Sequence, residues 1–251
     1  MMVMVKDETR FTFAIHKAGE MMRLVTWNAG RGQFARKMPL LDTFQPDIAV
    51  VPEVGRPETM DNHRLWFGTN PNQGLAITSS DSYNLEALPE KNGAPKYVVP
   101  VKVIGPVSFT LFAVWTIQGQ EMRYIRAVAT AIDLYADLFE QGPVVLMGDF
   151  NSNAIWDKDH PTHLNHSSVV GRLAKKGVVS GYHHHHKGEN HGTESEPTFF
   201  LHHKRNKPFH IDYCFLPTHW ADKLSLVQVG SFEAWQGLSD HRPLVLEMEV
   251  R

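Results

Sequence analysis

The stretch Pro143-Val144-Val145-Leu146-Met147-Gly148-Asp149-Phe150-Asn151-Ser152-Asn153 joins a short apolar run to a polar end. Consecutive β-branched and aliphatic residues closed by a glycine are typical of a buried strand. Asp149 and Asn151 lie two residues apart, and this spacing directs both side chains to one face of an extended backbone. A carboxylate beside a neutral carboxamide suits a hard cation or a phosphate oxygen. By itself the segment fits an ordinary polar turn after a strand equally well.

The composition is that of a soluble globular protein with a large core. The chain has 251 residues, of which 42% are hydrophobic and 21% charged, a length that suits one large domain or two small ones. The net charge of −2 and pI near 6.7 argue against tight capture of nucleic acid by bulk charge, although a local basic patch remains compatible. Cys214 is the only cysteine, which excludes an intramolecular disulfide and suits a reducing compartment.

The chain shows no targeting or membrane-spanning segment. No run approaches the roughly 18 apolar residues that a membrane span needs, and residues 1–20 lack the continuous apolar core of a signal peptide. We therefore expect a cytoplasmic protein. No internal repeat or low-complexity linker is visible, which favours a single domain over residues 21–251, with residues 1–20 as an N-terminal extension or edge hairpin.

The hydrophobic pattern predicts alternating strands and helices. The region 181–197 is polar and is expected to be a mobile loop. Helices are expected at 34–44, 121–139 and 169–176, and strands at 23–27, 47–53, 74–79, 209–216, 224–229 and 244–250, with a hairpin formed by 97–104 and 108–117.

Polar side chains stand at five separated strand ends or turns. One polar residue after a strand is usually a turn former, but five at the same kind of place suggest a shared site. Two carboxylates about 4 Å apart repel by roughly 4 kcal/mol at an effective dielectric constant of about 20, so converging acids require a cation. Oxygen ligands with one imidazole and no thiolate select Mg²⁺ or Mn²⁺ over zinc, with Ca²⁺ also suitable in a roomy site. The residues are Asn28, Glu53, Asp149 with Asn151, His210 with Asp212, and Asp240 with His241.

In this order the segments resemble the motif series of the endonuclease/exonuclease/phosphatase superfamily. The resemblance runs from about Met21 to the C-terminus, and compact bacterial members share the Gly-Asp-Phe-Asn-Ser-Asn and His-Ile-Asp-Tyr-Cys-Phe sequences. It implies the deoxyribonuclease-I-like fold, a four-layer α/β/β/α sandwich of two mixed β-sheets flanked by helices. The matching segments are Thr-Trp-Asn at 26–28, Pro-Asp-Ile-Ala-Val-Val-Pro-Glu at 46–53, Gly-Asp-Phe-Asn-Ser at 148–152, His-Ile-Asp-Tyr at 210–213 and Ser-Asp-His-Arg-Pro at 239–243.

The resemblance also implies roles for a metal site. Glu53 matches the principal metal-ligand carboxylate, and Asn28 and Asp240 match residues that complete the metal's surroundings. Asp149 and Asn151 match the pair that orients or deprotonates the attacking water and contacts the phosphate or a second metal.

Two further residues match the group at the scissile phosphate. His241 matches the histidine there, and Asp212 matches the carboxylate hydrogen-bonded to it. An aspartate on one ring nitrogen fixes the tautomer of an imidazole and favours its protonated form. Whether Asp149 or His241 takes the proton of the attacking water is left open.

One position departs from the family pattern. Many members carry a catalytic His or Tyr at the end of the strand before the central helix, where this chain has Trp115. An indole N–H donates a hydrogen bond but supplies no acid, so Trp115 is either a substrate-stacking residue or part of the core. Arg126 on the expected central helix is either a phosphate-contacting residue, alongside Asn151, or a structural ion-pair partner.

Two other features have open interpretations. The unspaced run His183–His186, with His191, shows no ligand spacing and is interpreted as a solvated or substrate-facing loop. The basic clusters either line an anion-binding cleft or form a solvated face. They comprise Arg31, Arg36 and Lys37, and Lys204, Arg205 and Lys207.

The sequence therefore predicts a Mg²⁺- or Mn²⁺-dependent phosphoesterase. A phosphodiester such as DNA or RNA is favoured as substrate, which makes the protein a nuclease, expected to be a monomer. A small-molecule or lipid-headgroup phosphatase remains an alternative, as does a degenerate member that binds nucleic acid or protein without turnover.

Overall fold

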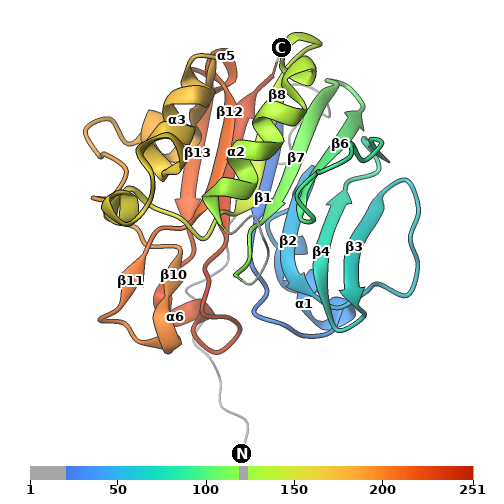
Figure 1. The fold of residues 1–251 in the computed structure, drawn as a ribbon. Helices are drawn as coiled ribbons and strands as arrows, with labels where there is room; N and C mark the ends of the chain where they lie inside the picture. Colours follow the sequence, from blue (N-terminus) through green and yellow to red (C-terminus); the bar gives the residue numbers. More distant parts are fainter. Residues whose placement is uncertain (1–20, 119–123, 251) are drawn as a thin grey trace, which may run out of the picture.

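The structure is a computed structural model that describes residues 21–118 and 124–250. Residues 1–20, expected to be an extension or edge hairpin, and the start of the helix expected at 121–139 lie outside the described residues. Figure 1 shows two twisted β-sheets packed together with helices on their outer sides. None of the helices in the described ranges is long and apolar enough to span a membrane.

The first sheet has the strand order β13-β14-β1-β2-β4-β3 and the second has the order β5-β6-β7-β8-β12-β9. Both are mixed, because β1 pairs parallel to β2 and β7 parallel to β8 while their other pairings are antiparallel. The strands of the first sheet are β1 (Met21–Thr26), β2 (Ile48–Val54), β3 (Arg64–Asn70), β4 (Gln73–Ser79), β13 (Leu224–Val229) and β14 (Leu244–Glu249). Those of the second are β5 (Asn84–Ala87), β6 (Val98–Ile104), β7 (Phe109–Trp115), β8 (Val144–Asp149), β9 (Val178–Ser180) and β12 (Asp212–Pro217).

Helices and a small hairpin complete the fold. The hairpin of β10 (Phe199–Phe200) and β11 (Pro208–Phe209) lies beside α6 below the sheets in Figure 1. The helices are α1 (Phe34–Asp42), α2 (Ile125–Leu134), α3 (His166–Ala174), α4 (Gly181–His185), α5 (Thr218–Ala221) and α6 (Phe232–Trp235). Turns of 3-10 helix span Ala136–Glu140, Ala154–Asp159, Thr162–Leu164 and Leu201–His203.

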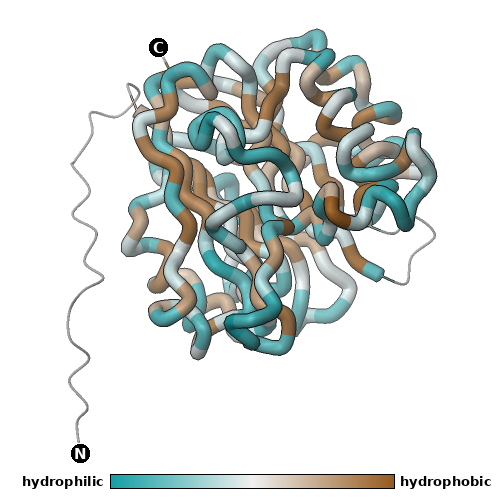
Figure 2. Tube along the Cα trace, turned by 90° about the vertical axis from the view of Figure 1, so that its left-hand side faces the viewer, coloured by the Kyte–Doolittle hydropathy of each residue, from teal (hydrophilic) through white to brown (hydrophobic). Residues whose placement is uncertain are grey.

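Three apolar clusters separate the four layers. The largest fills the space between the two sheets, the second lies between the second sheet and α2 and α3, and the third lies between the first sheet and α1. β8 belongs to two of them, since Val145 and Met147 face the inter-sheet core and Val144 and Leu146 face the helices. Figure 2 shows the apolar stretches inside and the hydrophilic ones mostly on outer loops. The α/β/β/α sandwich expected from the sequence is confirmed.

Most expected strands are found close to their predicted positions, and the hairpin expected from 97–104 and 108–117 is the antiparallel pair β6–β7. Three short or edge strands, β3, β5 and β9, were not predicted. The strand expected at 209–216 is divided, because β11 pairs with β10 while β12 pairs with β8. Between them the carbonyls of His210 and Ile211 accept from the Asn153 side chain and the Phe150 backbone.

The helix predictions are corrected at their ends. The helix expected at 34–44 ends at Asp42, and α2 ends at Leu134, after which Tyr135 leaves helical geometry and a 3-10 turn follows. The helix expected at 169–176 is α3 and begins at His166, because Asn165 and Ser168 form a capping box. The region expected to be a mobile loop begins with the helix α4.

The surroundings of Gly148 explain why β8 has a glycine immediately before Asp149. The residue lies opposite Val114 of β7 with φ of +143°, and an added Cβ would lie 1.9 Å from the Val114 carbonyl oxygen. We expect Gly148→Ala to lower the free energy of unfolding by about 3 kcal/mol or more, since backbone in a central ladder cannot retreat. Urea denaturation measures this change.

Gly171 provides a control of opposite sign. It lies inside α3, and a Cβ there meets no atom within 4 Å. Gly171→Ala is expected to raise the free energy of unfolding by about 0.5 to 1 kcal/mol through helix propensity. Equal stability of Gly148→Ala and the parent protein would contradict the steric explanation.

Candidate active site

The sheet topology brings the polar ends of five segments to one edge. β1, β2 and β8 reach this edge with their C-terminal ends. β12 and β14 run antiparallel to β8 and β1, and therefore bring their N-terminal ends to the same edge: Asp212 pairs with Asp149, and Leu244 pairs with Thr26. Register within each sheet and the packing of the two sheets, rather than proximity in sequence, bring Asn28, Asp149, Asp212 and His241 together.

Asp149 is the centre of the group. Its side chain is fully buried, and its Oδ2 accepts from Nδ2 of Asn28 and from Nδ2 of Asn151, both at 2.9 Å. Its Oδ1 accepts from the Asn151 backbone N–H at 2.9 Å. Burial and the Asp212 charge raise the pKa of Asp149 to about 7, although the His241 cation and the amide donors oppose the rise.

Asp212 and His241 form a buried pair beside it. Nδ1 of His241 lies 2.8 Å from Oδ2 of Asp212, and Nε2 lies 4.0 Å from Oδ2 of Asp149. Burial opposes protonation of His241, but the charge and hydrogen bond of Asp212 and the charge of Asp149 raise the pKa of the imidazole to about 9. His241 is therefore a cation at neutral pH, with one N–H held by Asp212 and the other facing Asp149.

Thr198 positions Asp212. Its Oγ1 accepts from the backbone N–H groups of Ile211 and Asp212, each at 3.0 Å, and its side chain is fully buried. Its carbonyl accepts from the Arg242 N–H at 2.6 Å, so Thr198 links the start of β12 to the loop that carries His241.

Glu53 lies next to Asp149 through a shared donor. Nδ2 of Asn28 is 3.2 Å from Oε1 of Glu53 as well as 2.9 Å from Asp149. Oε2 of Glu53 accepts from Nε2 of Gln73 at 2.9 Å, a contact that the sequence did not predict. As placed, Asn28 bridges the two carboxylates with its N–H groups, while its Oδ1 accepts from Gly30.

Asp240 lies close to His241 in the loop before β14. Burial lowers the pKa of Lys37 and the charge of Asp240 opposes that shift; the same charge helps to raise the pKa of His241. No side-chain hydrogen bond joins Asp240 to Asn28, Glu53 or Asp149 among the residues of 21–118 and 124–250. Ser239 connects this loop to the other side of the site, since its Oγ donates to the Asn28 carbonyl and accepts from the His241 N–H.

Two site residues have left-handed backbone. Glu53 has φ of +59° and Asn151 has φ of +45°, values that residues other than glycine adopt infrequently. Such conformations cost on the order of 1–3 kcal/mol and persist where the surrounding structure holds them. Their occurrence at both positions fits a site whose geometry, rather than local preference, selects the backbone.

Trp115 and Arg126, the two other residues predicted to bind substrate, lie in different surroundings. Trp115 is 5% exposed and packs on Tyr97 with ring centroids 4.7 Å apart, which favours a core role over substrate stacking. Arg126 is exposed in the first turn of α2, and its side chain forms no hydrogen bond or ion pair with the described residues.

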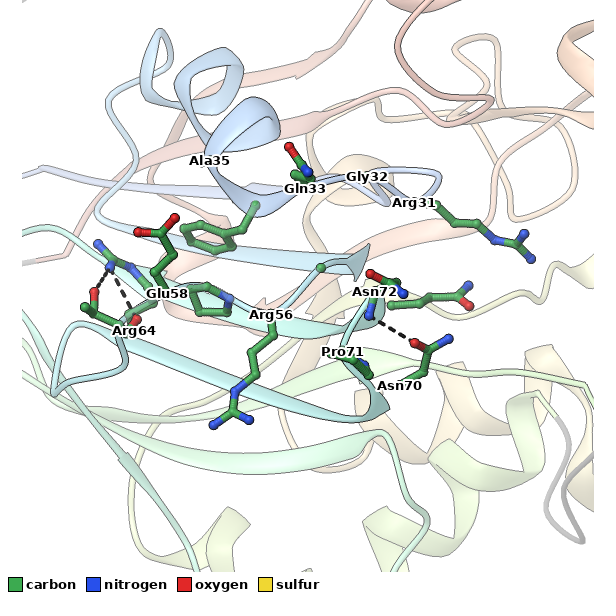
Figure 3. Close-up of a pocket in the computed structure, with 15 residues that line it drawn as sticks. Arg31, Gly32, Gln33, Ala35, Arg56, Glu58, Arg64, Asn70, Pro71 and Asn72 are labelled. Atoms are coloured by element: carbon green, nitrogen blue, oxygen red, sulfur yellow. Dashed lines mark hydrogen bonds between the residues drawn. The ribbon is translucent and has the colours of Figure 1, made fainter.

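A pocket of about 860 Å³ adjoins Glu53 through Gln73, which lines it. Three arginines also line it: Arg31 from the loop after β1, Arg56 from the loop after β2, and Arg64 from β3. Figure 3 shows their side chains spread around the pocket rather than gathered at one point. Arg64 is partly engaged, because it donates to Thr59.

The residues of the two basic clusters differ in their surroundings. Arg31 lines the pocket and Arg36 does not. Lys37 donates to the Ala29 carbonyl and lies over the Trp27 ring, a structural role. Arg205 pairs with Glu233 on the surface.

The interpretation of the histidine run as a solvated or substrate-facing loop is corrected. Its first three residues lie in α4, and the side chain of His183 is only 10% exposed. His183 contacts Ser180 and Glu194, so this part of the run belongs to a polar network in the interior.

No protein-family model matches the chain, and no curated protein matches its sequence. Solved structures do match. The AP endonuclease from Archaeoglobus fulgidus has a TM-score of 0.64 at 18% identity, with 91% of this chain and 100% of that chain covered. The 3′ phosphatase NExo from Neisseria, bound to a product DNA hairpin, has a TM-score of 0.62 at 20% identity, with 91% and 100% covered. An endonuclease/exonuclease/phosphatase from Beutenbergia cavernae has a TM-score of 0.59 at 15% identity, with 92% and 72% covered. The chain is thus an α/β sandwich with the deoxyribonuclease-I-like fold, the fold of endonuclease/exonuclease/phosphatase-type proteins.

Proposed function

We propose that the chain is a phosphoesterase that uses Mg²⁺ or Mn²⁺ to hydrolyse a phosphodiester of nucleic acid. The observation that supports this most directly is the buried group of Asp149, Asp212 and His241, whose ligand-type atoms lie within 4.8 Å of one another. Buried titratable groups that shift one another's pKa are characteristic of catalytic sites. The similar solved structures include nucleases and a 3′ phosphatase, which agrees with this chemistry.

The donor set fits a hard divalent cation. Carboxylate oxygens predominate and no thiolate is present. Oδ1 of Asp212, beside Asp149, is buried with no hydrogen-bond partner among the described residues and is free to face an ion. Glu53 and Asp240 are not part of the close group of Asp149, Asp212 and His241, so their carboxylates would have to move toward the ion. Glu53, Asp149 and Asp240 would hold the ion, and Asn28 would complete its surroundings by turning its amide oxygen inward. A cation bound there would neutralise phosphate charge and lower the pKa of a bound water.

The chain's own residues supply the proton chemistry. Asn28 and Asn151 hold the Asp149 carboxylate in one orientation, so Asp149 in its ionised form can accept the proton of an attacking water. Asp212 keeps His241 protonated, and the remaining N–H of His241 donates to a phosphate oxygen, where negative charge grows in the transition state.

The leaving group is not protonated by a residue at the end of β7. Trp115 occupies that place, is buried, and has no transferable proton. In this mechanism a water would protonate the leaving oxygen, or a bound cation would neutralise its charge. A leaving group with a low pKa, which needs no proton, is accordingly expected to react faster.

The pocket with three arginines favours a polyanionic substrate. Guanidinium groups spread over a cavity of about 860 Å³ match several phosphates better than one, because each binds a phosphate oxygen pair. Since Gln73 joins this pocket to Glu53, a strand whose scissile phosphate lies at the site can extend its neighbouring phosphates into the pocket.

A substrate panel tests the proposal. The purified chain is offered single-stranded and double-stranded DNA, RNA, a chromogenic phosphodiester, a phosphomonoester and a phosphoinositide, with Mg²⁺, with Mn²⁺ and with EDTA. We expect cleavage of nucleic acid that EDTA abolishes and added Mg²⁺ or Mn²⁺ restores. Turnover confined to the monoester or the phosphoinositide would overturn the nuclease assignment, and nucleic-acid binding without turnover under all metal conditions would overturn the enzymatic one.

Neutralising the pocket arginines is expected to weaken nucleic-acid cleavage selectively. Arg31→Gln with Arg56→Gln should lower kcat/KM for DNA or RNA by about 10-fold, and should reduce the slope of log affinity against log salt by about 1 for each phosphate that the pocket no longer binds. The chromogenic diester, which does not reach the pocket, should be cleaved at the parent rate. Arg36→Gln is the control, because Arg36 is exposed and does not line the pocket. Equal reduction on both substrates would contradict the pocket's role.

A further inference from the structure

A second group of metal-ligating side chains lies apart from the candidate active site, in the segment between β9 and β10. His183 belongs to α4, and His191 and Glu194 follow in the loop. One ligand atom of each lies within 4.8 Å of those of the other two. The side chains of His183 and Glu194 are 10% and 4% exposed. We refer to these three residues as the histidine–glutamate group.

Hydrogen bonds orient both imidazoles of this group. Nδ1 of His183 contacts the Ser180 hydroxyl at 2.8 Å, while its Nε2 lies 3.2 Å from Oε1 of Glu194. Nδ1 of His191 lies 2.9 Å from Nε2 of His166. Metal-binding histidines are held in this way, with one ring nitrogen hydrogen-bonded and the other on the metal.

The carboxylate of Glu194 is also fixed in place. Its Oε1 accepts from Nδ2 of Asn153 at 3.0 Å, and its Oε2 accepts from the Gly192 N–H at 3.0 Å. A buried anion surrounded by imidazoles requires a positive charge, either a ring proton or a cation.

A fourth histidine provides an independent indication of a ligand. His210 is 2% exposed, and its Nδ1 lies 2.8 Å from the Glu196 carbonyl. Its Nε2 is buried and has no hydrogen-bond partner among the described residues, which is uncommon for a buried polar atom. The His210 ring centroid is 6.0 Å from that of His183, and His210 and Glu194 both line a pocket of about 440 Å³.

We propose that His183, His191 and Glu194 bind a zinc ion, with His210 as the candidate fourth ligand. Imidazole nitrogens with one carboxylate select Zn²⁺ over Mg²⁺ or Ca²⁺, which prefer oxygen ligands. The rings of His183 and His191 stack with centroids 3.6 Å apart. Binding requires the two rings to turn apart, because each ring must direct its lone pair at the same ion.

The ion would have a structural role. Asn153, in the loop that follows β8, donates both to Glu194 and to the His210 carbonyl. Thr198, which positions Asp212, follows Glu194 by four residues. Zinc would therefore fasten the 181–197 segment to the edge of the second sheet that carries the catalytic aspartates. This site needs no phosphoester and is independent of the proposed hydrolysis.

Zinc binding is tested on the full chain without a histidine tag. The protein is stripped with a chelator, saturated with Mg²⁺ and titrated with ZnCl₂ against a fluorescent zinc chelator, with zinc content measured by mass spectrometry. We expect one tightly held equivalent and a higher Tm with zinc. His191→Gln and Glu194→Gln should weaken binding by about 100-fold or more, and Ser180→Ala by about 10-fold.

Two controls separate this site from others. His185→Gln changes a less buried histidine of the same run and should bind zinc as the parent does, and Glu53→Gln should also keep its zinc equivalent. Absence of a tight zinc equivalent in the parent would overturn the proposal, as would its loss in Glu53→Gln alone.

If the ligand variants fail to fold, Co²⁺ bound to Glu53→Gln decides instead. The visible spectrum of a tetrahedral nitrogen–oxygen site supports the proposal, and the absence of that spectrum overturns it. No outcome depends on turnover, so failure here and failure of the proposed hydrolysis are distinguishable.

Discussion

Asp149→Asn is expected to lower kcat for phosphodiester cleavage by about 10³-fold while leaving the fold intact. The substitution keeps the shape of the side chain but removes its charge and its capacity to accept a proton, and a positioned general base contributes about 10²- to 10⁴-fold. KM should change less than kcat, because Asp149 acts on the attacking water.

Stability should not fall in parallel with the rate. Burial and Asp212 raise the pKa of Asp149 to about 7, so the ionised carboxylate is disfavoured in the folded protein. With a folded pKa above the unfolded value, this group makes the protein less stable as pH rises from about 4 to 7, and asparagine removes that penalty. The substitution also turns an amide N–H toward Asn28 or Asn151, which limits the gain.

The measurement combines single-turnover kinetics with urea denaturation at pH 8. Asp159→Asn serves as the matched control, because Asp159 is an exposed acid in the 3-10 turn that follows β8. It should retain the parent rate. If Asp149→Asn keeps more than about a tenth of the parent rate, Asp149 is not the general base.

The second large effect concerns the Asp212–His241 pair. The parent rate should rise with pH as Asp149 ionises and fall as pH passes about 9, where His241 loses its proton. A bound divalent cation favours the ionised form of Asp149, so the acid limb is expected below pH 7. The resulting profile is bell-shaped, with its alkaline limb assigned to His241.

Asp212→Asn should move that alkaline limb. Because the Asp212 charge and hydrogen bond hold the pKa of His241 up against burial, their removal lets burial lower that pKa, opposed only by the charges of Asp149 and Asp240. At pH 8 the imidazole becomes neutral, and kcat should fall by about 10²- to 10³-fold. His241→Gln should remove the alkaline limb altogether.

Stability follows the same titration. The folded pKa of His241 lies above the unfolded value of 6.5, so the stability it contributes is fully present below pH 6.5 and is lost as pH rises through about 9. Denaturation of the parent and of Asp212→Asn at pH 6 and pH 9.5 measures this. An alkaline limb at the same pH in both proteins would show that His241 is not its source.

Local sequence predicted the strands because their burial is encoded in consecutive residues. β8 is buried on both faces and forms an unbroken apolar run, and β6 and β7 are joined by a short Gly-Pro turn. The edge strands β3 and β5 are partly exposed, so their residues carry no comparable pattern. The early end of α2 depends on Tyr135, whose hydroxyl accepts from the Lys91 N–H, a contact between distant segments.

Only part of the candidate site was predicted, because only some of its residues lie in recognisable sequence patterns. Asp149, Asp212 and His241 were identified because they end or precede recognisable strands in a known motif order. Gln73 and Arg56 were not, because nothing in their neighbourhoods distinguishes them from ordinary turn residues. Trp115 could be assigned to the core only once its packing on Tyr97 was visible.

The sequence by itself determined the identity of the polar strand ends and the kind of cation they suit, because strand periodicity and side-chain chemistry are local properties. The four-layer class followed from the resemblance of the motif series to a known superfamily. The tertiary structure alone decided that Asp149 and Asp212 are register partners, that Asn28 bridges two carboxylates, and that His183 and His191 meet Glu194 in the interior. These contacts join residues whose separation in space is set by sheet register and loop packing, and no periodic signal in the chain records either.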